Sequence, residues 1–116
     1  MNRADFLAHF KSRLLELYAI TEKAHQEYAD VNNAFDNFDR LAVDLNIDRK
    51  KILWVYAKKH LDGIRTYLND PTRASREPIS GRISDVIVYM ILLDAMIVDE
   101  MKSLVGNYEI KPRSFQ

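Results

Sequence analysis

The stretch Glu77-Pro78-Ile79-Ser80-Gly81-Arg82-Ile83-Ser84-Asp85-Val86-Ile87-Val88-Tyr89, which continues almost entirely apolar to Val98, decides the fold. Pro78 suits the first turn of a helix, because its missing N–H would be unpaired there in any case. Lys102 and then Gly106 are typical of a helix C-terminus and of the residue just beyond it. The stretch therefore predicts one long helix that begins near Glu77 and carries charged residues on its first turns.

Apolar side chains occupy nearly the whole circumference of this helix, at Ile83, Val86, Ile87, Val88, Met90, Ile91, Leu92, Leu93, Met96, Ile97 and Val98. A helix that is apolar all round must be central in its bundle or shared with a partner chain. We expect a homo-oligomer that pairs through this last long helix. The alternative is a monomer whose other helices wrap it completely.

The rest of the chain predicts two further long helices and a short one. Helical spacing and a candidate N-cap at Asp5 indicate a helix from about residue 4 to 29. A short helix follows, and a third long helix begins after Asp48. The residues that recur at helical spacing in the first helix are Phe6, Phe10, Leu14, Leu17, Tyr18, His25 and Tyr28. The short helix should carry Phe35, Phe38, Leu41 and Ala42 inward, and the third long helix has a stripe of Leu53, Tyr56, His60, Ile64 and Tyr67.

No segment alternates as a strand would, so the sequence predicts an all-α fold. We expect a small helical bundle of three long helices and one short helix, in a single domain over residues 1–106. Residues 107–116 would form a loosely ordered tail, in which Pro112 argues against helix.

Composition excludes several classes of protein. Lys plus Arg and Asp plus Glu both number 17, so there is no clear nucleic-acid footprint. There is no cysteine, which excludes disulfides and thiolate metal sites. The N-terminus lacks a signal-peptide pattern, and the apolar run from Val86 to Val98 is too short for a bilayer. We expect a cytoplasmic protein without a membrane segment.

The fourth helix carries the first candidate site. Arg82, Asp85 and Tyr89 share one face, because residues three and four apart are neighbours on a helix. Together they could contact a ligand phosphate, a metal and a base, or Arg82 and Asp85 could form an ordinary surface pair. Glu77 fits a metal ligand or an acid that stabilises the helix N-terminus. Asp94, inside the apolar run, could be a buried structural carboxylate or part of a site.

The first and third helices add further candidates. Lys59 is a natural phosphate contact, and His60 lies on the apolar stripe as either a core histidine or a ligand-binding residue. Glu22 and His25 show the spacing of a di-metal bundle, but no second such pair accompanies them.

Several of these motifs, taken together, resemble the nucleotide-modification-associated domain family of phages and bacteria. They are Glu27-Tyr28, Asn33-Ala34-Phe35-x-Asn37-Phe38, Lys59-His60 and Glu77-Pro78-x7-Asp85-x3-Tyr89, spread over roughly residues 23 to 98. That family is all-α and loosely similar to the all-α nucleoside triphosphate pyrophosphatases, which hold Mg²⁺ through acids on facing helices. The resemblance implies metal ligands at Glu27, Glu77 and Asp85, with ligand contacts at Tyr28, Lys59, His60 and Tyr89.

Three positions depart from the family pattern. Ala29 stands where the family has Gly, Val88 where it has Asn, and Arg82 where it often has an acid. Exchanging an acid for a cation disfavours Mg²⁺, which prefers carboxylate and phosphate oxygens, but it favours a pocket that binds phosphate.

Two functions fit these residues. In the first, a phage-type protein binds a nucleotide or a nucleotide-derived ligand and could hydrolyse its phosphates with Mg²⁺. In the second, a non-catalytic anti-defence protein acts as a nucleotide sponge or docks on a host protein. The same residues serve both functions, so the sequence does not separate them.

Overall fold

The computed structural model describes residues 1–28, 32–73 and 77–105, except for the side chains of residues 25–28 and 105. Within these ranges the chain forms four helices and no strand: α1 (Arg3–Tyr28), α2 (Asp36–Leu45), α3 (Arg49–Asn69) and α4 (Ile79–Val105). The all-α prediction of three long helices and one short helix is confirmed. The tail predicted at 107–116 lies outside the described residues.

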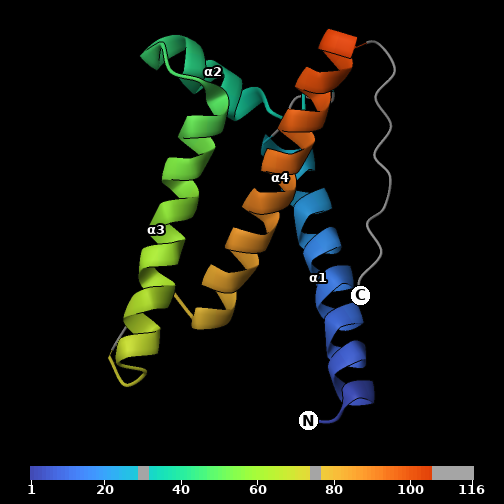
Figure 1. Cartoon of the computed structure of the whole chain (residues 1–116), viewed down its shortest axis with the longest axis vertical. Coiled ribbons are helices and arrows are strands. Elements are labelled where there is room, and N and C mark those ends of the chain that lie inside the picture. Colours follow the sequence, from blue (N-terminus) through green and yellow to red (C-terminus); the bar gives the residue numbers. More distant parts are fainter. Residues whose placement is uncertain (29–31, 74–76, 106–116) are drawn as a thin grey trace.

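The helices α3 and α4 form an antiparallel pair, and this pair is the most extensive contact in the fold (Figure 1). The short helix α2 packs near the start of α3, while α1 contacts α4. Arg13 of α1 donates hydrogen bonds to the Ser84 hydroxyl and to the Ser80 carbonyl of α4. The first turns of α4 therefore have α3 on one side and α1 on the other.

The hydrophobic core is small and lies where α2, α3 and α4 meet. Leu53 and Met96 are fully buried, beside Phe38 and Ile52. Partly buried residues complete the cluster: Phe35, Leu41, Ala42, Tyr89, Leu92 and Leu93. The inward face predicted for the short helix is confirmed, because Phe38 is buried and Phe35, Leu41 and Ala42 pack against the same cluster.

The N-cap predicted for α1 is wrong. The N-cap is Asn2, whose Oδ1 accepts a hydrogen bond from the Asp5 backbone N–H at 2.8 Å, and not Asp5 itself. The apolar stripe has the expected spacing, but only Leu17 is buried, and Phe6, Phe10, Leu14 and Tyr18 are exposed. The stripe stays open because α1 contacts α4 over only a short stretch and has no larger contact with another described helix.

The helix α4 is half-buried rather than enclosed. Among its described side chains only Met96 is buried, and Ile83, Ile91 and Ile97 are exposed. Asp94 is exposed too, so the expectation of a buried carboxylate at this position is wrong. No described helix combines the length and the apolar character needed to cross a membrane.

An ion-pair cluster joins three helices at the end of the bundle where α3 begins. The Arg49 guanidinium lies 3.2 Å from Asp39 of α2, and 3.3 and 3.4 Å from Asp99 and Glu100 of α4. It also stacks over the Phe35 ring, with its central carbon 4.9 Å from the ring centroid. One largely buried cation thus holds α2 and α4 against the first turn of α3.

Arg49→Ala is expected to lower the free energy of unfolding by about 2 kcal/mol, because three carboxylates lose a shared and largely desolvated partner. Arg40→Ala is the control, since the Arg40 side chain is 68% exposed and contacts Asp36 and Asn37, which both lie in α2. The control should cost less than about 0.5 kcal/mol. Urea unfolding of both variants measures the difference, and equal losses would contradict this role of Arg49.

Candidate metal centre

Three ionisable side chains meet where α3 faces the start of α4. His60 lies in α3, Asp85 in the second turn of α4, and Glu77 two residues before α4 begins. His60 Nε2 is 3.4 Å from Asp85 Oδ2, and His60 Nδ1 is 3.5 Å from Glu77 Oε2. One ligand atom from each residue can be chosen so that all three lie within 4.8 Å of one another. That spacing is compatible with a single cation.

Burial distinguishes this cluster from a surface ion pair. The His60 side chain is only 8% exposed, whereas those of Glu77 and Asp85 are 37% and 50% exposed. His60 Nδ1 is inaccessible and makes no hydrogen bond with the described residues, although Glu77 Oε2 lies 3.5 Å away. A buried polar atom in this state costs about 1–3 kcal/mol and calls for an explanation, and a bound ion is one. The site is therefore open to a ligand on its carboxylate side and closed on its histidine side.

A glycine allows the two helices to approach beside this cluster. A Cβ atom at Gly63, one turn after His60, would overlap the Arg82 side chain of α4. The absence of a side chain at Gly63 gives Arg82 room to lie across α3. Arg82 is three residues before Asp85, so the two side chains belong to the same face of α4.

Tyr89 forms the inner wall of the site. Its ring stacks on the His60 imidazole, with centroids 5.9 Å apart and planes inclined by 30°. It also meets Phe38 and Tyr56 in an aromatic cluster that continues into the core. Burial raises the pKa of the Tyr89 phenol, and the charge of Asp85 raises it further, with smaller effects from Tyr56 and Glu77. At neutral pH Tyr89 is therefore a neutral hydrogen-bonding group.

Lys59 lies at the outer rim. Its Nζ is 3.8 Å from Glu77 Oε1, and its side chain is 69% exposed. An exposed pair of this kind contributes little to stability. Lys59 is thus available to a second anion without cost to the fold.

A cavity of about 310 Å³ adjoins the cluster between α1, α2 and α4. Asp85 and Tyr89 belong to both the cluster and the cavity wall, and Asn37 and Thr21 add polar groups. The remaining lining is apolar: Ile20, Ala24, Ala34, Phe38, Val88 and Leu92. Its volume lies at the lower end of the range of small-molecule sites.

The structure brings together five of the predicted site residues, His60, Glu77, Asp85, Tyr89 and Lys59, and places Arg82 against α3 beside them. The side chains of Glu27 and Tyr28 lie outside the described residues, so the predicted triad of Glu27, Glu77 and Asp85 stays a prediction. Sequence reasoning assigned His60 to ligand binding and not to the metal. Asn37 was quoted only as part of a motif, with no role, and Thr21 and Gly63 were not singled out, because only the tertiary packing gives them a role.

Comparison of the chain with protein-family models, with curated proteins and with solved structures found no match.

The donor set can be compared with the preferences of different metals. A histidine nitrogen with two carboxylate oxygens suits Mn²⁺, Fe²⁺ or Zn²⁺, because imidazole is a good ligand for transition metals. Mg²⁺ favours oxygen ligands and keeps several waters. The contribution of His60 therefore favours a transition metal over the Mg²⁺ expected from carboxylates alone.

Absorbance titration of the phenols, with Tyr89→Phe as the difference reference, should show that Tyr89 ionises above the ordinary value of 10.0. The folded state favours the neutral phenol of Tyr89. The contribution of Tyr89 to the free energy of unfolding is therefore fully present below pH 10 and declines as the pH rises above 10. Asp85→Asn should reduce the shift without abolishing it, since burial is the larger cause. An ordinary pKa for Tyr89 would contradict the close packing described here.

Proposed function

We propose that this protein binds a nucleotide through a divalent cation held by His60, Glu77 and Asp85. The observation that carries the proposal is the buried His60 imidazole, whose Nδ1 lies 3.5 Å from Glu77 and whose Nε2 lies 3.4 Å from Asp85. A lone pair on one ring nitrogen would gain a partner from a cation, and the two carboxylates would offset the cation's charge.

The charges around the cluster support a phosphate as the second ligand. Two carboxylates alone would repel a phosphate, but a bound divalent cation neutralises them and offers open coordination positions. Lys59 at the rim and Arg82 on the first turns of α4 supply further positive charge. Arg binds phosphate oxygens well because its guanidinium can donate two parallel hydrogen bonds.

The neighbouring cavity supports a nucleoside as the remainder of the ligand. A base in the 310 Å³ cavity would lie beside the Tyr89 ring, with Asn37 and Thr21 as hydrogen-bonding groups. Aromatic side chains offer a stacking surface to any base. The base would lie close to the metal cluster, because Asp85 belongs both to that cluster and to the cavity wall.

The second candidate is binding without turnover. Hydrolysis would require the cation to activate a water beside the phosphate. A nucleotide sponge needs only affinity for the nucleotide. The positive charge of Arg82, at a position where the resembled family often has an acid, favours the sponge. The resemblance to the nucleotide-modification-associated domain family, and with it a phage-type role in the host cytoplasm, belongs to the same proposal. So do the homo-oligomer and a host protein partner.

Calorimetric titration with Mn²⁺, followed by nucleotide with and without the metal, tests the proposal. Asp85→Asn keeps the shape of the side chain but removes its charge, so it should weaken Mn²⁺ binding by about tenfold or more. Asp62→Asn is the matched control, because Asp62 is an exposed acid of α3 paired with Lys58. It should leave binding unchanged.

Equal nucleotide affinity with and without metal, in the wild type and in Asp85→Asn alike, would contradict the cation-mediated site. With binding established, phosphate release over time separates the two candidates. Metal-dependent release supports the phosphohydrolase, and stable retention of intact nucleotide supports the sponge.

Gly63→Ala tests the position of Arg82. Alanine usually stabilises a helix by about 1 kcal/mol relative to glycine, but here its Cβ would displace the Arg82 side chain. We expect little net change in melting temperature, unchanged Mn²⁺ affinity and a nucleotide affinity about tenfold weaker. Gly81→Ala is the control, because its Cβ would meet nothing closer than Pro78 Cδ at 4.0 Å. Unchanged nucleotide binding in Gly63→Ala would remove Arg82 from the phosphate site.

A further inference from the structure

The exposed apolar residues of α1 follow a seam that α4 covers only in part. Leu7, Phe10, Leu14 and Leu17 are spaced by three, four and three residues, the spacing of a coiled-coil face. Leu7 and Phe10 are both 51% exposed and Leu14 is 44% exposed, whereas Leu17 is 4% exposed. We call Leu7, Phe10 and Leu14 the open α1 seam.

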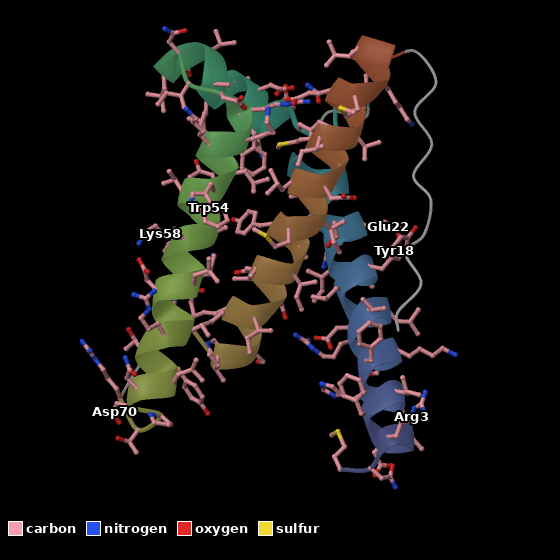
Figure 2. The ribbon with its side chains drawn as sticks, in the orientation of Figure 1. Arg3, Tyr18, Glu22, Trp54, Lys58 and Asp70 are labelled. Carbon is pink, nitrogen blue, oxygen red and sulfur yellow. The ribbon has the colours of Figure 1, made fainter. Side chains whose placement is uncertain are left out.

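The open α1 seam extends past the beginning of α4. Figure 1 shows the first turns of α1 continuing beyond the start of α4, with no other helix beside them. Arg3, at the start of α1, lies far from the labelled residues of α3 in Figure 2. An isolated helical segment of this length is marginal in water without tertiary contacts. The first half of α1 therefore needs a packing partner that the described helices of this copy do not supply.

A hollow of about 440 Å³ between α1 and α4 continues the seam. Its lining is almost entirely apolar and consists of Leu14, Leu17, Tyr18, Thr21, Ala34, Phe35, Val88, Ile91, Leu92 and Ala95. Ile91 is 58% exposed and Tyr18 is 71% exposed. The seam and the hollow together form one continuous apolar strip, which the other described residues leave uncovered.

The accessible surface of the chain gives the size of the missing contact. The chain exposes 9645 Å², whereas a folded monomer of its mass should expose about 6,600 Å². Residues 29–31, 74–76 and 106–116 could account for at most about 2,900 Å² of this accessible surface. After that area is subtracted, the accessible surface of the described residues still exceeds that of a folded monomer of their mass by about 900 Å². An interface of standard size buries about 800 Å² per partner.

We infer that a second copy of this chain packs on the open α1 seam and its adjoining hollow. The excess exposed area is of the same size as one side of a standard dimer interface, and a seam with coiled-coil spacing is complementary to an identical seam. The formal net charge is zero, so no charge repulsion opposes association of two copies. The interface predicted on α4 is thus placed chiefly on α1, with Ile91 of α4 at its edge.

Sedimentation and light scattering of Leu7→Asp and Leu68→Asp test the inference. Both substitutions place a charge at an exposed leucine, but Leu68 is 72% exposed near the end of α3, away from the seam. The wild type and Leu68→Asp should have twice the chain mass of 13.6 kDa. The Leu7→Asp dimer should dissociate to monomers at protein concentrations at least tenfold higher than those at which the wild-type dimer dissociates. A monomeric wild type, or a Leu7→Asp variant as tightly dimeric as the control, would overturn the inference.

Hydrogen exchange of the wild type gives a second test that needs no variant. Pairing through the seam predicts that backbone amides of residues 3–14 exchange more slowly as protein concentration rises, while those in the middle of α3 do not change. Exchange at residues 3–14 that is independent of concentration would overturn the inference even if Leu7→Asp failed to fold.

Discussion

The antiparallel packing of α3 against α4 is the contact on which the remaining structure depends. It buries Leu53 and Met96, gives α2 a surface on which to place Phe38, and sets His60 opposite Asp85. The Arg49 cluster fixes one end of the pair, and the passage of Arg82 over Gly63 allows close approach at the other. The register between the two helices therefore decides both the core and the candidate site, because a shift of one turn would separate His60 from its carboxylates.

The candidate site combines features that conflict unless a ligand is present. A histidine that is almost fully buried, with one nitrogen unpartnered, lies between two carboxylates that are partly open to water. In a purely structural role, hydrophobic residues of similar volume would pack as well or better. As ligands of a bound cation, the same three groups would all be paired. Tyr89 connects them to the core through its stacking on His60, so the site rests on rigid helices rather than on a loop.

Helical periodicity predicted the elements well, because each helix has its own pattern and its own start signal. The Asp48 N-cap and the inward face of the short helix are confirmed. Burial was harder to predict. Asp94 was expected inside and is exposed, and the α1 stripe is open, because periodicity shows which face is apolar but not what covers it. The candidate site, too, was predicted only in part. Glu77, Asp85 and Tyr89 could be proposed from one helix, whereas the pairing of His60 with two acids and the use of Gly63 depend on contacts between residues distant in sequence.

Anomalous diffraction from crystals grown with Mn²⁺ tests whether His60, Glu77 and Asp85 bind one cation. We expect one strong anomalous peak between these three residues, within about 2.0–2.3 Å of a His60 nitrogen and of an oxygen from each acid. The same peak should be absent from crystals of Asp85→Asn. A wild-type map without density there, with His60 hydrogen-bonded to the two carboxylates in its place, would show that the cluster is a structural ion pair and would contradict the account.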